Sequence, residues 1–393
     1  MSRYYVLASL LFVWLTLGES QADTSSVRVG LDLEIGDVSS TSDEAIRLGA
    51  EQAIEEINRA GGVLNGRPLE LVIRDNRSVP ARGVANLREF AEMPELVAVM
   101  TGKFSPVALE QVRALPETRV VLLDPWAAAD GIINNGQNPN WAFRLSLSDS
   151  MAVAAVLRQV KRDGFRRLGV LLPNIAWGRS NHDALKALAP KYGITLSGAE
   201  WYNWGGDASL MQNYVALRQA GAQVVFLVAN EREGAFFVRE LAKLPVVQRL
   251  PVISHWGITG GDFPKMCGDA LNKVDLRVVQ TYAFSQARNE RAKRLAEAAR
   301  HRFSVEQPDS IPSPVGVAHA YDLIHLLGRA INLAGSTERM AIRAALENLP
   351  AHDGVVKRYP QPFTAKRHEA LSESDLFFAR YGADGRLSPS GKP

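Results

Sequence analysis

The residues best placed to bind a small molecule lie in the segment Thr101-Gly102-Lys103-Phe104-Ser105-Pro106. This turn follows an apolar run and precedes a helical pattern, with Ser105 expected as the N-cap and Pro106 at the first helical position. A hydroxyl beside the free N–H groups of a helix start can hold a carboxylate or another electron-rich group. An ordinary helix cap explains the same residues equally well, so both interpretations stay open. Lys103 could add a charge, although a lysine is more often solvated.

The sequence contains no arrangement typical of catalysis or of a metal centre. G-x-S-x-G, H-E-x-x-H, P-loop and paired-cysteine zinc spacings are absent. The seven histidines are scattered, and the closest two, His319 and His325, are six residues apart and do not share a helix face. We therefore predict a protein that is not an enzyme and that holds no metal and no cofactor.

Residues 27–73 have the pattern of a strand, a helix and a second strand, and the loop at 34–42 joins the first strand to the helix. Apolar residues alternate from Val27 to Leu33 and then recur at helical spacing from Ile46 to Ile57. Gly61-Gly62 ends the helical pattern. The loop at 34–42 therefore lies at the carboxyl end of a strand, where open α/β sheets bind ligands.

The same alternation of strands and helices continues along the chain. Further strands are expected at 96–100, 119–123, 167–172, 224–228, 251–253 and 276–281. Such alternation predicts parallel sheets with helices on both faces. The βα units form two separate series, so we expect two similar domains, with breaks near 143–149, 282–287 and 353–359.

The N-terminal residues Met1–Ala22 have the pattern of a secretory signal peptide, with one early charge, an apolar run and a small-residue ending. We expect cleavage after Ala22 and a periplasmic location, and a retained N-terminal anchor is the alternative. No later stretch approaches the ~20 apolar residues of a membrane span.

The formal charge of +3 is too small to indicate nucleic-acid binding, and Cys267 is the single cysteine of the 393 residues.

Three segments resemble one known family. They read GAEQAIEEINRAGGVLNGRPLELV at 49–72, HAYDLIHLLGRAINLAGS at 319–336 and AIRAALENLPAHDGVV at 341–356. In this order and spacing they resemble the type I periplasmic solute-binding proteins, specifically the Leu/Ile/Val-binding branch that serves ABC importers. The resemblance covers essentially all of the chain after the signal peptide.

The resemblance implies two doubly wound α/β lobes joined by three crossovers, with the ligand trapped between them. Placed at the three breaks, the crossovers give a first lobe of residues 27–145 plus 284–353. The second lobe is then 146–283 plus 354–380, followed by a tail at 381–393.

The resemblance also implies ligand contacts at the strand-end turns. In the family a threonine commonly helps to hold the ligand at the position of Ala128, and this chain offers Trp126 two residues earlier. Trp177 resembles the family's aromatic residue that closes over the ligand. Asn230 lies where another aromatic is usual, with ordinary turn chemistry as its alternative role.

Trp256 occupies the turn whose acidic residue usually pairs with an amino acid's ammonium group. Tyr282, at the expected second crossover, is a candidate for lining the cleft or for stiffening a hinge. Three tryptophans on turns that face the cleft favour stacking on a flat or apolar ligand. Because Trp256 cannot pair with an ammonium group, we do not carry over branched-chain amino acids as the ligand. A cation bound over the rings is the alternative.

We expect an extracytoplasmic protein that closes two lobes over a small organic solute and delivers it to an inner-membrane ABC permease. The alternative is a ligand-sensing component of a signalling or periplasmic oxidation system. A hydrolase on this fold is a third, less favoured hypothesis, because no nucleophile pair is recognisable. No nucleic-acid partner is expected.

Overall fold

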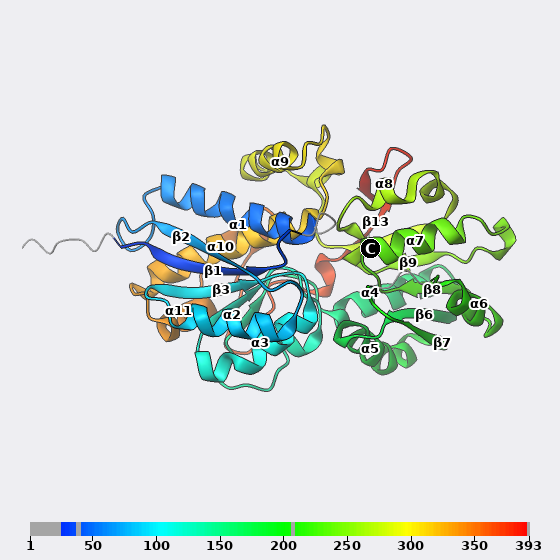
Figure 1. Ribbon diagram of the computed structural model, residues 1–393, viewed down its shortest axis with the longest axis horizontal. Coiled ribbons are helices and arrows are strands. Elements are labelled where there is room, and N and C mark those ends of the chain that lie inside the picture. Colours follow the sequence, from blue (N-terminus) through cyan, green and yellow to red (C-terminus); the bar gives the residue numbers. More distant parts are fainter. Residues whose placement is uncertain (1–24, 37–40, 206–208, 391–393) are drawn as a thin grey trace, which may run out of the picture.

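The computed structural model describes residues 25–36, 41–205 and 209–390, and this part of the chain forms two lobes (Figure 1). Each lobe contains one large sheet with helices on both faces, which confirms the predicted α/β class. A small antiparallel pair, β11 (His352–Asp353) and β12 (Arg358–Tyr359), lies apart from the two large sheets. None of the helices in these ranges has both the length and the apolar content that a membrane crossing requires. The predicted signal peptide at 1–22 lies outside the described residues, as do residues 37–40 of the loop at 34–42.

The first lobe contains a five-stranded parallel sheet in the order β2-β1-β3-β4-β5. Its strands are β1 (Val27–Leu33), β2 (Leu69–Asp75), β3 (Leu96–Thr101), β4 (Val121–Asp124) and β5 (Ala142–Arg144). Helices α2 (Pro80–Ala91) and α3 (Ser105–Thr118) pack together, and α1 (Thr41–Arg59) packs against α10 (Pro314–Ala334). Helices α9 (Glu290–Phe303) and α11 (Arg339–Glu347) contact α1 and α10 respectively.

The second lobe contains a seven-stranded sheet in the order β14-β13-β10-β9-β8-β6-β7. Its parallel strands are β6 (Arg167–Pro173), β7 (Thr195–Tyr202), β8 (Val224–Leu227), β9 (Val252–Ser254) and β10 (Leu276–Gln280). Two antiparallel strands, β13 (Phe377–Tyr381) and β14 (Leu387–Pro389), extend the edge beside β10. The helices are α4 (Asp149–Arg162), α5 (Ala176–Tyr192), α6 (Met211–Gln219), α7 (Glu231–Leu241) and α8 (Phe263–Cys267).

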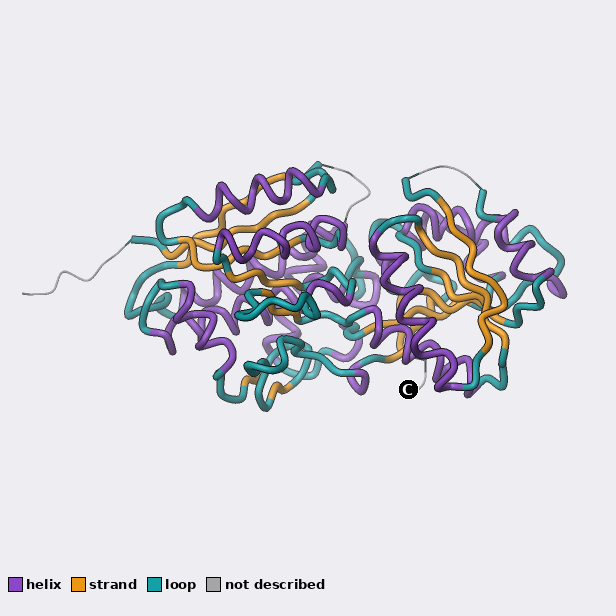
Figure 2. The backbone as a smooth tube through the Cα atoms, turned by 90° about the horizontal axis from the view of Figure 1, so that it is seen from below, coloured by secondary structure: helices purple, strands orange, loops and turns teal. Residues whose placement is uncertain are grey.

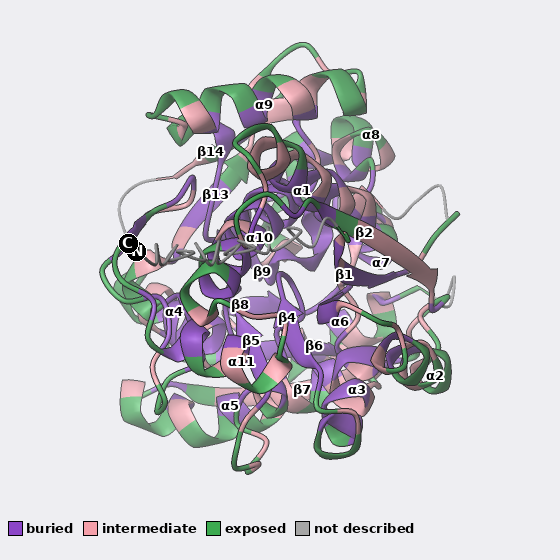
Figure 3. Cartoon of the chain, turned by 90° about the vertical axis from the view of Figure 1, so that its left-hand side faces the viewer, coloured by how far each residue is buried: buried purple, intermediate pink, exposed green. Residues whose placement is uncertain are grey.

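Figure 2 shows the two sheets as separate groups of strands, with chain segments passing between the lobes on one side. The first connection is residues 145–148, between β5 and α4, and the second is residues 281–289, between β10 and α9. Buried residues fill the central strands and the inner faces of the helices, whereas the outer faces of α2, α5 and α9 are exposed (Figure 3). Strands β3 and β4 of the first lobe are buried along their whole length, as expected of parallel strands that are covered on both faces.

The third connection lies later in the chain than we expected, because residues 354–369 pack on the first lobe. Tyr359 Oη donates a hydrogen bond of 2.8 Å to Asp322 on α10. Glu369 forms an ion pair with Arg144 at the end of β5, where the two residues also form a β-bridge. A buried arginine requires a counter-charge, and Glu369 supplies it before the chain crosses to β13 through residues 370–376.

The segment expected to be a tail, residues 381–393, contains the last strand of the second sheet. Its strand β14 pairs with β13, and Ser390 N donates to Phe378 O at 2.7 Å. Residues 391–393 lie outside the described residues.

Candidate functional site

A small cavity lies between the two lobes, at the carboxyl ends of strands from both sheets. Six of the seven predicted site residues line it: Ser105, Trp126, Ala128, Trp177, Asn230 and Trp256. Lys103, Phe104 and Gly257 complete its wall. The cavity volume is ≈ 20 Å³, whereas one water needs about 10–15 Å³. The structure brings the predicted residues together with their side chains nearly filling the space, and their contact with a ligand stays a prediction.

The first-lobe wall is the loop after β4, which carries Trp126 and Ala128. The carboxylate of Asp124 holds this loop, because it accepts hydrogen bonds from the backbone N–H groups of Trp126 (3.0 Å) and Ala127 (2.7 Å). Burial raises the pKa of Asp124 to about 7, against the opposing effect of Arg144. The loop therefore has a fixed backbone, which places Ala128 in the cavity wall.

Arg144, which is fully buried, ties the same loop to the third connection. Its Nη1 donates to the carbonyl oxygens of Ala127 (3.1 Å) and Ala129 (2.9 Å), and its Nε donates to Glu369 at 2.9 Å. The second guanidinium nitrogen reaches the other carboxylate oxygen of Glu369 at 2.5 Å. This two-point pairing fixes the planar guanidinium and, with it, the loop that carries Trp126.

Ser105 lies at the start of α3, but it is not the N-cap. Phe104 takes that position in an extended conformation and makes no side-chain cap hydrogen bond, so Ser105 is the first helical residue. The buried Ser105 hydroxyl oxygen accepts a long hydrogen bond of 3.4 Å from Ala129 N. The predicted cap role is wrong by one residue, while the hydroxyl still lines the cavity at the positive end of a helix.

Trp177 forms part of the second-lobe wall, in the first turn of α5. Its Nε1 donates to Asp149 Oδ1 at 3.1 Å, and its side chain is buried. Gly257 makes room for the ring, because a Cβ atom added there would lie 2.7 Å from Trp177 Cη2. Trp177 therefore requires a glycine at position 257.

Trp256 and Trp126 face each other across the two lobes. Trp256 begins the 3-10 turn Trp256–Thr259 after β9 and is almost fully buried. The two ring centroids are 5.5 Å apart and the ring planes are tilted by 40°. This contact is one of the points at which the lobes meet, and it forms the centre of the aromatic wall.

Asn230 is the residue before α7, and it makes no side-chain cap hydrogen bond to that helix. Its amide group faces the cavity beside Gly257. The ordinary turn role that was the alternative for this residue is therefore not seen, and the amide is placed to meet a polar atom in the cavity.

Lys103 was discussed from the sequence but was expected in solvent, whereas its side chain is only 10% exposed. Its Nζ lies 3.4 Å from Glu34 Oε2. Burial disfavours the charged form, yet Asp43, Glu231 and Glu34 together raise the pKa of Lys103 above its ordinary value. Because Glu231 belongs to α7 of the second lobe, the ammonium group attracts carboxylates from both lobes. In the sequence, the only indication that Lys103 would lie in the cavity wall was its position in a strand-end turn.

Tyr282 does not line the cavity. It lies in the second connection, where it is buried and packs edge-on against Phe284, with ring centroids 5.1 Å apart. Burial raises the pKa of its phenol. Of the two roles considered for Tyr282, its position fits a contribution to the connection.

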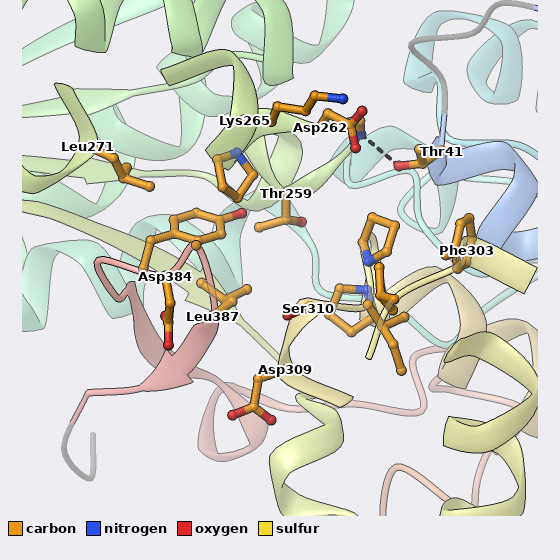
Figure 4. Close-up of a pocket in the computed structure, with 18 of the residues that line it drawn as sticks. Thr41, Thr259, Asp262, Lys265, Leu271, Phe303, Asp309, Ser310, Asp384 and Leu387 are labelled. Carbon is orange, nitrogen blue, oxygen red and sulfur yellow. Dashed lines mark hydrogen bonds between the residues drawn. The ribbon is translucent and has the colours of Figure 1, made fainter. Parts of the chain in front are cut away.

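A second and larger cavity of ≈ 670 Å³ opens on another side of the lobe interface (Figure 4). Its wall combines first-lobe residues such as Phe303 and Asp309 with second-lobe residues such as Leu271 and Leu387. Thr41 Oγ1 accepts a hydrogen bond of 2.7 Å from Gly261 N at its edge. None of the predicted site residues lies in this cavity. We favour the smaller cavity as the ligand site, because it lies at the strand ends where α/β sheets bind ligands.

The comparisons with known proteins identify the family and the fold. The family model described as "Periplasmic binding protein" matches residues 26–386. The chain belongs to this family. The predicted type I fold and the predicted solute-binding function are confirmed at this level. The Leu/Ile/Val-binding protein homolog 3 of Brucella melitensis is 25% identical over 354 residues, which cover 89% of each protein.

Solved structures of similar proteins share the whole fold. The periplasmic binding protein type 1 from Bordetella pertussis has a TM-score of 0.82 at 21% identity and covers 93% of this chain and 100% of its own. The LivJ protein from Streptococcus pneumoniae, in complex with isoleucine, has a TM-score of 0.78 at 18% identity and covers 94% and 100%. An R. palustris solute-binding protein, in complex with benzoate, has a TM-score of 0.76 at 17% identity and covers 93% and 96%. At these identities the similarity establishes the fold alone.

Proposed function

We propose that this periplasmic binding protein captures a small, flat solute without an α-ammonium group and presents it to an inner-membrane ABC permease. The observation that carries this proposal is the composition of the cavity wall. Three indoles line it, and among the described residues none of the lining side chains carries a carboxylate.

The two facing indoles fit a flat ring. Carbon atoms pack at about 3.5 Å, so a ring inserted between two others needs about 7 Å between the flanking centroids. Trp126 and Trp256 are 5.5 Å apart. Because these rings belong to different lobes, a small increase in lobe separation opens a space between them. A ring inserted there stacks on both indoles and so links the two lobes. The bound solute thereby stabilises the ligand-bound closed form relative to the open form.

An amino acid fits the same cavity poorly. Its buried ammonium group needs a carboxylate partner, since an unpaired buried charge is strongly unfavourable. Trp256 occupies the turn where the family usually has that acidic residue. The charge nearest the cavity is the ammonium group of Lys103, and Glu34 and Glu231 already compensate it.

The polar end of the solute has its own partners. Ser105 and Asn230 line the cavity, and the first N–H groups of α3 lie beside Ser105. The R. palustris protein holds benzoate on this fold, which supports an aromatic ligand with one polar end. The S. pneumoniae protein holds isoleucine on the same fold, so the side chains of the wall must decide between the two ligand classes.

The remaining steps follow from the predicted export signal and from the family. The signal peptide at 1–22 directs the chain to the periplasm, where the protein works without a catalytic step. Solute shifts the equilibrium from open to closed lobes, and the permease recognises the closed form. Neighbouring permease and ATPase genes would support delivery, whereas a neighbouring histidine kinase or dehydrogenase gene would support the sensing alternative.

A thermal-shift screen of the protein purified from the periplasm tests the ligand class. The probes are benzoate, benzyl alcohol, benzamide, leucine, isoleucine and valine. We expect the flat compounds to raise the melting temperature, because about 100 Kd of ligand adds roughly 2.7 kcal/mol. Trp126→Ala should abolish the shift, and Trp201→Ala, which lies outside the cavity, is the control. Stabilisation by the aliphatic amino acids alone would contradict the proposed ligand class.

A further inference from the structure

We propose that Asp149 is a positioning residue that orients the second-lobe wall of the ligand cavity. It does so through the hydrogen bond that it accepts from the indole of Trp177. The proposal rests on the function proposed for this cavity, and it adds a residue that does not itself line the wall.

The carboxylate of Asp149 is fully buried and gathers polar groups on one of its oxygens. Its Oδ1 accepts from Trp177 Nε1 at 3.1 Å and from Asn181 Nδ2 at 2.8 Å. His255 Nε2 lies 3.2 Å from the same oxygen but forms no hydrogen bond with it. A buried carboxylate is unfavourable without hydrogen-bond donors, so the Trp177 and Asn181 donors and Asp149 fix one another.

Asp149 is not needed as the cap of its own helix. Ser148 is the N-cap of α4, and its hydroxyl accepts from Met151 N at 3.2 Å. The Asp149 side chain is therefore available for Trp177. An acidic residue in the first turn also interacts with the helix dipole, and that simpler role is the alternative that the experiment must separate.

The orientation of two wall rings depends on this cluster. The His255 ring stands edge-on to Trp177, with centroids 5.0 Å apart and planes at 87°. The same imidazole stands edge-on to Trp256, at 6.1 Å and 83°. Asp149 therefore holds Trp177 through a hydrogen bond, and the His255 ring packs against both this indole and Trp256.

Asp149 also contacts the wall of the other lobe through its backbone. Its N–H donates to the carbonyl oxygen of Ala128 at 2.7 Å. Asp149 directly follows the first connection, residues 145–148. One residue at this connection thus contacts both sides of the cavity, and its loss should affect ligand affinity more than a buried aspartate elsewhere.

The first experiment measures benzoate affinity by calorimetry for Asp149→Leu, Asp149→Asn and the wild type. Leucine removes the acceptor and should weaken binding by about tenfold or more, whereas asparagine keeps a carbonyl acceptor and should stay within about threefold. Asp322→Asn is the matched control, since Asp322 is fully buried, does not line the cavity and accepts from Val355 N at 2.8 Å. Its affinity should equal that of the wild type.

A double-mutant cycle separates positioning from a role in the helix start. In Trp177→Phe the ring remains but the N–H donor is absent, so adding Asp149→Leu should have less effect than it has alone. Equal, additive losses in both backgrounds would overturn the proposal, because Asp149 would then act independently of the Trp177 N–H.

A readout without ligand distinguishes failure of this proposal from failure of the proposed function. In ¹⁵N-tryptophan spectra, the indole N–H of Trp177 should exchange more slowly in the wild type and in Asp149→Asn than in Asp149→Leu. If no aromatic probe binds the wild type, the function is wrong, and the exchange rates still test the contact. Unchanged exchange in Asp149→Leu would overturn the positioning role.

Discussion

The two lobes share one strand order but form their sides of the cavity from different chemical groups. The order β2-β1-β3-β4-β5 in the first lobe matches β7-β6-β8-β9-β10 in the second. The first lobe contributes an ammonium group, a hydroxyl and one indole from Lys103, Ser105 and Trp126. The second contributes two indoles and an amide from Trp177, Trp256 and Asn230. The shared topology sets where the strand ends meet, and each lobe places different side chains there.

The lobes also differ in how they hold their walls. In the first lobe the loop of Trp126 is held by the ion pair of Arg144 with Glu369, which lies on a segment far along the chain. In the second lobe Trp177 is held by N–H donation to Asp149 within the lobe. We therefore expect the first wall to be sensitive to loss of charge and the second to loss of a hydrogen-bond acceptor.

The substitution Arg144→Met, which affects the first-lobe wall of the cavity, should have the largest effect on stability. The substitution leaves the carboxylates of Glu369 and Asp124 without their buried counter-charge, so the free energy of unfolding should fall by about 3–5 kcal/mol. Urea unfolding at pH 7 measures this loss. Arg158→Met is the control, because its ion pair with Glu373 is 38% and 48% exposed and should contribute at most about 1 kcal/mol. Similar losses in both variants would contradict the comparison.

A second prediction concerns the pH dependence of stability contributed by His319. This imidazole is fully buried in the first lobe, between Pro125 O at 2.9 Å and Thr281 Oγ1 at 3.0 Å. Burial lowers its pKa from 6.5 to about 4. Between these values the unfolded chain binds a proton that the folded chain does not, so this contribution to stability is complete above pH 6.5 and is lost as pH falls towards 4.

The variant His319→Gln should remove that loss, which amounts to about 2 kcal/mol between pH 7 and pH 5. Guanidinium unfolding at pH 7 and pH 5 measures it, as the difference between variant and wild type. The difference is needed because burial raises the pKa of Asp32 and Asp124 to about 7, and these groups contribute a slope of the opposite sign. Thr281→Val keeps the imidazole and should keep the slope. An unchanged slope in His319→Gln would show that another group titrates.

The two substitutions with the smallest expected effect test which lobe binds the polar end of the solute. Ser105→Ala and Asn230→Ala each remove one polar group from the cavity wall, and a lost hydrogen bond costs about 0.5–1.5 kcal/mol. If the first lobe holds the carboxylate, Ser105→Ala weakens benzoate binding several-fold and Asn230→Ala does not. Calorimetry with benzoate and benzyl alcohol measures both. Because Phe104 is the N-cap, Ser105→Ala should leave the melting temperature nearly unchanged, and wild-type affinity in both variants would exclude these contacts.

Much of the site could be predicted because it depends on the ends of strands. Alternating apolar residues locate a strand, and the turn after it then falls at the carboxyl edge of a parallel sheet. Trp126, Trp177 and Trp256 lie on such turns and were assigned to the cleft by the family resemblance, and they line one cavity. The family resemblance supplied the pairing of the two lobes, which periodicity does not contain.

The structure differs from the predictions at residues whose position depends on packing between segments that are distant in the sequence. Tyr282 had two candidate roles, lining the cleft or stiffening a hinge, and its buried position against Phe284 fits the second, because the path of a connection depends on both lobes together. The helix boundary at Ser105 differed by one residue, which is the usual uncertainty of a helix start. The burial of Lys103 depends on Glu231 from the other lobe, and nothing adjacent to Lys103 in the sequence indicates it.

The sequence by itself determined the α/β class, the order of the strand-end turns and the residues those turns carry, because these follow from local periodicity and from helix and turn chemistry. Only the tertiary structure decided that Trp126 contacts Trp256, that Asp149 receives the Trp177 N–H, and that Arg144 pairs with Glu369, 225 residues later. Such contacts join segments that are distant in the chain. Their geometry is set by how the two sheets and three connections pack, and no local pattern records it.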